Sequence, residues 1–91
     1  MKDWERRFFA LNATGEVELV GIPPEVVLDA VSSAGWASDD SLWSPNLQIR
    51  RFVRGEDELF LFDETYFDLK VTGSEDQVRE IQYLVDRRWK K

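Results

Sequence analysis

The sequence predicts an α+β domain, an antiparallel sheet of about five strands with two helices on one face. Short segments of alternating or aromatic-rich residues recur between turn residues, and two longer segments carry apolar residues at helical spacing. At 91 residues the chain suits one domain, 1–91. Two helices that each carry a single apolar stripe need a common surface, and one face of an antiparallel sheet supplies it. The predicted order is β-β-α-β-β-β-α.

The first two strands are expected over residues 4–11 and 16–22. Residues 4–11, WERRFFAL, are rich in aromatics and end at a cluster of turn residues. Residues 16–22, EVELVGI, begin with alternating acidic and apolar side chains, which is typical of a half-buried strand. Because the connection is short and contains glycine, the two segments are predicted to pair as a hairpin.

The first helix is predicted to begin at Pro23-Pro24-Glu25, because proline is tolerated in a first turn and an acid there complements the helix dipole. Its apolar stripe consists of Val26, Val27, Ala30, Val31 and Ala34. Gly35 ends it where a left-handed residue is favoured. Residues 35–45 read as a loop in which Trp36 folds back against the last helical turn and Trp43 lies over an open edge of the core. Both tryptophans are also interface candidates, since loop aromatics often anchor contacts.

The second half of the chain predicts three strands and a helix. The strands are expected at 47–54, 59–62 and 66–72, each bounded by turn residues. Ser74 followed by Gln77 fits a capping box that opens the second helix. Its apolar side consists of Val78, Ile81, Leu84, Val85 and Trp89.

Part of this second half resembles a known family. Residues 67–85, FDLKVTGSEDQVREIQYLV, are similar to the strand, glycine and capped helix that end KH-type RNA-binding domains. The resemblance covers about a fifth of the chain and implies fold alone. The GXXG loop with which those domains grip nucleic acid is missing from this sequence, so the resemblance implies no RNA-binding role.

Composition excludes several classes of function. The sequence has no Cys and no His, which removes thiolate metal sites, disulfides and the commonest general base. It contains no Walker A, dinucleotide-binding or calcium-loop pattern, so we predict a non-enzymatic protein without metal or cofactor. A signal peptide's apolar stretch and a membrane-spanning run are also missing, which predicts a cytoplasmic protein without membrane contact.

The charge distribution suggests one contact surface. The net charge is −6, which disfavours nonspecific attraction to nucleic acid. No Lys or Arg occurs from Ala10 to Ile49, so the first helix and the loop with Asp39 and Asp40 are expected to form an acidic face. Such a face fits a basic groove on another protein, although a solvated surface without a binding role would show the same pattern. We therefore expect a small acidic regulator, adaptor or inhibitor of an unidentified partner protein, and an inhibitor from a phage or other mobile element would fit.

Strand alternation suggests a second contact surface. If Leu47, Ile49 and Val53 point at the helices, their neighbours on the same strand point away and carry aromatic and basic groups. Three interpretations stay open: an interface with a second copy or another protein, a platform on which single-stranded nucleic acid stacks, or burial by the N-terminal segment or by sheet curvature. The first predicts a homodimer or a stable complex that buries Phe52 and at least one of Phe60 and Phe62. The candidate partner-binding residues are Trp36, Asp39, Asp40, Trp43, Arg50, Phe52, Arg54, Phe60, Phe62 and Tyr66.

Overall fold

A computed structural model describes residues 3–12, 16–64 and 68–89 of the chain, except for the side chains of residues 9–12. The described elements are α1 (Asp3–Asn12), β1 (Glu16–Leu19), α2 (Pro24–Ser33), β2 (Ala37–Ser44), β3 (Leu47–Arg54), β4 (Asp57–Glu64), β5 (Leu69–Thr72) and α3 (Glu75–Arg88). The strands form a 5-stranded sheet in the order β1-β5-β4-β3-β2, and each neighbouring pair is antiparallel.

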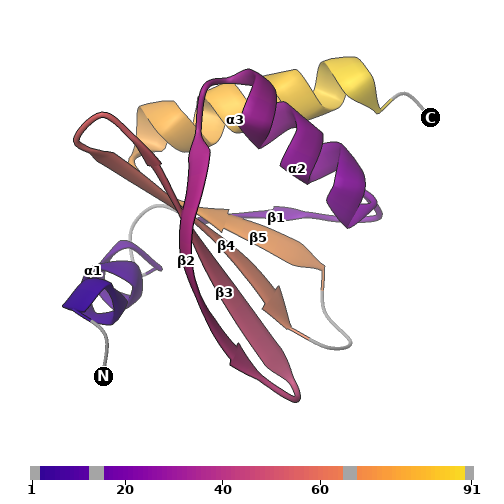
Figure 1. The fold of residues 1–91 in the computed structure, drawn as a ribbon. Helices are drawn as coiled ribbons and strands as arrows, with labels where there is room; N and C mark the ends of the chain where they lie inside the picture. Colours follow the sequence, from indigo (N-terminus) through magenta and orange to yellow (C-terminus); the bar gives the residue numbers. More distant parts are fainter. Residues whose placement is uncertain (1–2, 13–15, 65–67, 90–91) are drawn as a thin grey trace.

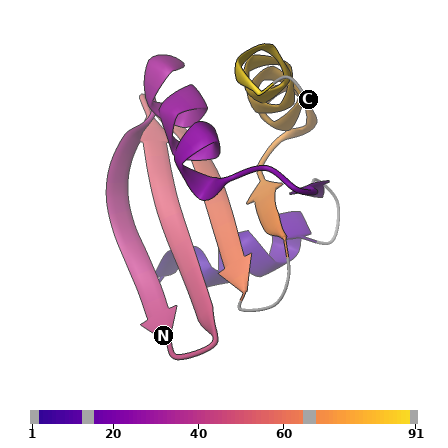
Figure 2. The same cartoon turned by 90° about the vertical axis from the view of Figure 1, so that its right-hand side faces the viewer.

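The sheet is covered on both faces. α2 and α3 lie side by side over one face, and α1 lies on the other (Figures 1 and 2). The hairpin of β2 and β3 extends beyond the two helices, so its far end is not roofed by α2 or α3 (Figure 1). The predicted α+β class, with an antiparallel sheet and two helices on one face, is confirmed, and α1 is an additional helix.

The main core fills the space between the sheet and the pair α2 and α3. Each of these helices contributes its apolar stripe, and the sheet contributes alternate residues of its strands. The largest fully buried members are Leu59, Leu61, Ile81, Val27, Val31, Val71 and Val85. The apolar stripes of α2 and α3 and the apolar face of the sheet are thus buried against one another, which stabilises the packing of the two layers.

A second, smaller core joins α1 to the opposite face of the sheet. Trp4 and Phe8 of α1 pack on Ile49 and Phe60, and Phe62 packs against this cluster. The Phe8 ring meets Phe60 edge-on and stacks on Phe62, with centroids 5.5 Å apart in both pairs. The N-terminal segment therefore buries aromatic residues on the far face of the sheet. This is one of the three interpretations that the sequence left open for those residues.

The strand predicted over 4–11 is wrong, because these residues belong to α1. Trp4 and Phe8 stand four residues apart, so in a helix both reach the same side. The predicted hairpin between 4–11 and 16–22 is wrong for the same reason. β1 instead pairs with β5, with Val17 opposite Val71.

Two further expectations about the sheet need correction. Residues 35–45 are not a loop, since Ala37–Ser44 form the edge strand β2, which turns directly into β3. The faces of β3 are also reversed relative to the prediction. Ile49 belongs to the α1-side core, whereas Phe52, 6% exposed, packs in the core under α2 and α3. Phe60 and Phe62 do point away from those two helices, as expected.

The helix ends follow the sequence signals closely. Gly35 adopts φ +90 after α2, and its N–H donates to Ser32 O while the Trp36 N–H donates to Val31 O. These two bonds form the Schellman ending for which glycine is favoured. The Ser74 side chain accepts from the Gln77 N–H in a complete capping box at the start of α3. Both predicted helix boundaries are thus explained by local hydrogen bonding.

Candidate protein-interaction site

Three neighbouring strands place polar and aromatic side chains together where the sheet extends past α2 and α3. In the register of the sheet, Trp43 of β2 stands opposite Gln48 of β3, which in turn stands opposite Asp63 of β4. The residues that precede or follow them, Leu42, Ile49 and Phe62, pack on the α1 side. Side chains alternate along a strand, so this row faces the α2 side.

The next row on the same face contains Ser41 and Arg50, which are also paired in register. We call the five residues of the two rows the open sheet face, namely Ser41, Trp43, Gln48, Arg50 and Asp63. Trp43 is 71% exposed, whereas Gln48, Arg50 and Asp63 are half-buried. An exposed tryptophan beside half-buried polar groups is an arrangement that suits contact with another molecule.

Hollows run along the open sheet face. One of about 130 Å³ is lined by Trp43, Pro45, Gln48 and Asp63 together with their neighbours Ser44 and Leu47. A second, of about 340 Å³, is lined by Ser38, Asp39, Asp40, Ser41, Gln48 and Arg50. Gln48 borders both, so the two hollows form one continuous surface along β2 and β3.

Arg50 is the basic group of this surface. Its guanidinium donates to Gln48 Oε1 at 3.4 Å. Within the described part of the chain, no carboxylate lies within 4.0 Å of that guanidinium. Its neighbours Pro24, Leu28, Leu61 and Leu69 form an apolar pocket of about 20 Å³ with Asp63, large enough for one water molecule. Arg50 therefore retains donors for a carboxylate or carbonyl of another molecule.

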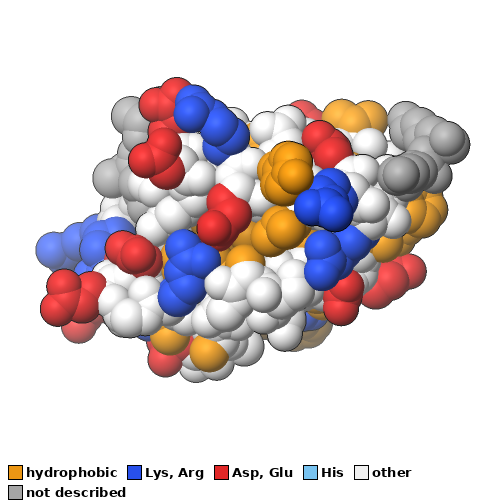
Figure 3. All heavy atoms as spheres, turned by 90° about the horizontal axis from the view of Figure 1, so that it is seen from above, with side chains coloured by type: hydrophobic (Ala, Val, Ile, Leu, Met, Phe, Trp, Pro, Cys, Tyr) orange, Lys and Arg blue, Asp and Glu red, His pale blue; other side chains and the backbone are white. Residues whose placement is uncertain are grey.

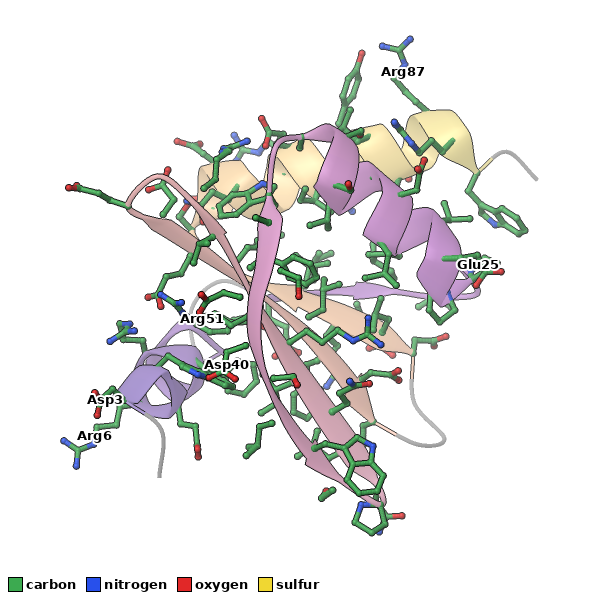
Figure 4. All side chains as sticks on the ribbon, viewed as in Figure 1. Asp3, Arg6, Glu25, Asp40, Arg51 and Arg87 are labelled. Carbon is green, nitrogen blue, oxygen red and sulfur yellow. The ribbon has the colours of Figure 1, made fainter. Side chains whose placement is uncertain are left out.

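Asp39 and Asp40 contribute mainly to holding α1 on the sheet. The Trp4 indole donates to Asp40 Oδ2 at 2.7 Å, and Arg51 pairs with Asp39. Figure 4 shows Asp40 and Arg51 on the side of the sheet that faces α1. Both aspartates also border the larger hollow, so they lie at the rim of the open sheet face.

Glu58 accepts hydrogen bonds from Arg51 of β3 and from Arg7 of α1, so it connects the helix to the sheet. The Arg51 Nε donates to Glu58 Oε2 at 2.7 Å, and Arg7 of α1 donates to both Glu58 oxygens at 2.5 and 2.8 Å. The hydrogen bond from Arg7, with support from Arg51, holds the pKa of the Glu58 carboxyl below its ordinary value. This network is a structural clasp for α1.

The other predicted site residues lie away from the open sheet face. Trp36, 4% exposed, is a core residue, and the Arg54 guanidinium lies 4.4 Å from its ring centroid. Arg54 donates to Ala34 O and Glu80, so it joins the end of α2 to α3. Phe52 and Phe60 are buried in the two cores, Phe62 is partly buried beside Phe8, and Tyr66 falls outside the described residues.

The homodimer prediction rested on exposed aromatic residues at this sheet. Phe52 and Phe60 are buried within one chain, so neither is exposed for a second copy to cover. The oligomeric state remains a prediction without that support.

The outer surface of α2 and α3 carries charges of both signs. Seen from above, acidic and basic side chains alternate over this face with hydrophobic groups between them (Figure 3). Asp29 of α2 accepts from Arg88 of α3 at 2.8 Å, so one of the acids expected on an acidic face is neutralised by the neighbouring helix. Arg87 projects away from the molecule at the far end of α3 (Figure 4). The described residues of α2 and α3 therefore mix charges of both signs on this face.

The candidate partner-binding residues predicted from the sequence did not include Ser41, Gln48 and Asp63. The sequence feature that could have located Ser41 and Gln48 is the pair Pro45-Asn46, which forms the two-residue connection between β2 and β3. Reading it as a hairpin turn would have made 37–44 a strand and fixed which residues oppose one another. The register of β4 would still have been needed to bring Asp63 beside Gln48.

In the ranges that the structure covers, no group of three or more His, Cys, Asp or Glu residues could hold a metal ion. None of the helices seen there is long and apolar enough to cross a membrane. The chain matches no protein-family model, no curated protein and no solved structure.

Proposed function

We propose that this chain is a non-enzymatic protein-interaction module and that the open sheet face is its contact surface. The observation that carries the proposal is Trp43, which is 71% exposed at the end of an edge strand. Tryptophan is among the residues that most often dominate binding energy in protein interfaces. It stands here beside half-buried polar groups that fix the orientation of a bound segment.

The edge position of β2 supplies a second means of contact. Among the described strands, β2 pairs with β3 and lies at the edge of the sheet, which is the place where an extended segment can add a further strand. A strand added at a sheet edge gains affinity from main-chain hydrogen bonds and specificity from alternate side chains. On the α2 side, those alternate side chains would meet Trp43 and Arg50.

The overall charge favours a basic partner. With a net charge of −6, the chain attracts cationic surfaces and repels polyanions at long range. The alternative of single-stranded nucleic-acid binding required several aromatic rings on one open face. Phe52 and Phe60 are buried, so neither ring is open to stack on a base, which weakens that alternative.

The proposal is tested by affinity capture from the organism that encodes the chain, with wild type and two variants as bait. Trp43→Ala removes the exposed anchor, and Tyr83→Ala removes an aromatic side chain of similar exposure, 60%, on α3. A partner that depends on the open sheet face is retained by Tyr83→Ala and lost by Trp43→Ala. For the purified pair, we expect Trp43→Ala to weaken binding by about 2 kcal/mol, roughly 30-fold. Equal binding by both variants contradicts the proposal.

A further inference from the structure

We infer that the row Trp43, Gln48 and Asp63 binds the guanidinium of an arginine that the partner protein carries. This inference rests on the proposed function and identifies the chemistry that the open sheet face recognises. Its geometric basis is the strand register, in which Trp43 and Asp63 flank Gln48 on the same face. Two strand spacings, about 9.5 Å in total, separate the backbones of the outer two residues. The hollow of about 130 Å³ above Gln48 lies between an aromatic ring and a carboxylate.

The Asp63 carboxylate forms no ion pair with any residue that the structure describes. Among the residues described, no Lys or Arg side chain lies within 4.0 Å of it. Arg50 lines a pocket with Asp63, yet its hydrogen bond goes to Gln48 Oε1 at 3.4 Å. Asp63 is half-buried, so an incoming cation would be partly shielded from water and would gain more than at an open surface.

An arginine suits this row better than a lysine. A guanidinium is flat, stacks on an indole ring and forms two parallel hydrogen bonds with one carboxylate. Trp43 supplies the ring, Asp63 supplies the carboxylate, and the Gln48 side chain lies between them. An ammonium group is a point charge that can satisfy the carboxylate but gains less from the ring. The net charge of −6 attracts further basic residues of the same partner segment at long range.

The test uses three small probes and NMR detection of the Trp43 indole N–H. N-acetyl-arginine amide, N-acetyl-lysine amide and N-acetyl-citrulline amide are each titrated into the isotope-labelled protein. Citrulline keeps the shape of arginine but lacks its charge. We expect the Trp43 resonance to shift progressively with the arginine probe, to respond several-fold more weakly to the lysine probe, and not to shift with citrulline.

Two variants then locate the interaction. Asp63→Asn is expected to weaken the arginine response by roughly tenfold, as the loss of a shielded ion pair predicts. Glu25→Gln, which removes an exposed carboxylate at the start of α2, should leave it unchanged. Equal responses to arginine and lysine, or an unchanged response in Asp63→Asn, overturn the inference. If Trp43→Ala abolishes partner binding although the arginine probe never shifts Trp43, the interaction module stands and guanidinium recognition is refuted.

Discussion

Replacing Phe8 with alanine tests whether α1 is an integral cover of the sheet. Phe8 is 0% exposed and packs on both Phe60 and Phe62. Truncating a fully buried phenylalanine costs about 3–5 kcal/mol, which combines the lost transfer free energy with the cavity left behind. A domain of this size is stable by about 5–15 kcal/mol, so Phe8→Ala should remove roughly a fifth of its stability or more.

The assay is urea unfolding followed by circular dichroism, with Arg6→Ala as the control. Arg6 is exposed on α1 and points away from the sheet (Figure 4), and arginine and alanine have similar helix propensities. We expect Arg6→Ala to change the free energy of unfolding by less than about 0.5 kcal/mol. A loss below about 1 kcal/mol in Phe8→Ala would show that α1 does not pack on the sheet, and would return Phe60 and Phe62 to the list of accessible residues.

Three other substitutions test the main core, the clasp and a helix end. Phe52→Glu should unfold the chain instead of dissociating an assembly, because it places a charge in the core under α2 and α3; circular dichroism and sedimentation distinguish the outcomes. Glu58 has a pKa below its ordinary value of 4.5, so its contribution is present above that value and is lost as the pH falls through the folded pKa. Urea unfolding from about pH 6 to about pH 3 should therefore show a steeper loss in wild type than in Glu58→Gln, and parallel curves would exclude the clasp. Gly35→Ala should lower the free energy of unfolding by about 1–2 kcal/mol, because φ is +90 at this position and alanine is strained there. The added Cβ itself has room, since its nearest neighbour, Arg54 Cδ, would lie at an ordinary 3.6 Å. Thermal unfolding measures the change, and an unchanged melting temperature would contradict the Schellman ending.

Local hydrogen bonding made the helix ends predictable from the sequence. The glycine after α2 and the Ser74 to Gln77 pair act within a few residues, so no knowledge of the tertiary fold was needed. The segment 4–11 offered no such signal. Its aromatic residues fit a strand by propensity and a helix by the four-residue spacing of Trp4 and Phe8, and a short segment leaves that ambiguity open.

Because α1 was predicted as a strand, the two faces of β3 were assigned in reverse. A strand covered by helices at different places on both faces carries large apolar residues on each side. Ile49 is buried by α1 and Phe52 by the helix pair, so counting aliphatic residues could not show which side faced α2 and α3. The open sheet face was hidden for the same reason. Arg50 was expected to lie on an exposed face with Phe52, whereas Phe52 is buried under α2 and α3. The neighbours of Arg50 on the open sheet face, Trp43 and Asp63, depend on pairings across three strands.

The outer edge of β2 distinguishes between a second copy and a basic partner. β2 has 8 residues and lies at one edge of the sheet, where an unprotected strand invites pairing with another chain. A register shift between Ser38 and Asp40 and the acidic pair at 39 and 40 interrupt it. Pairing two copies along β2 would bring two acidic strands together on chains that each carry a net charge of −6. A basic extended segment is instead attracted by the net charge of the chain, and it can place an arginine over Gln48. The features that hinder self-association at this edge therefore favour a partner of opposite charge.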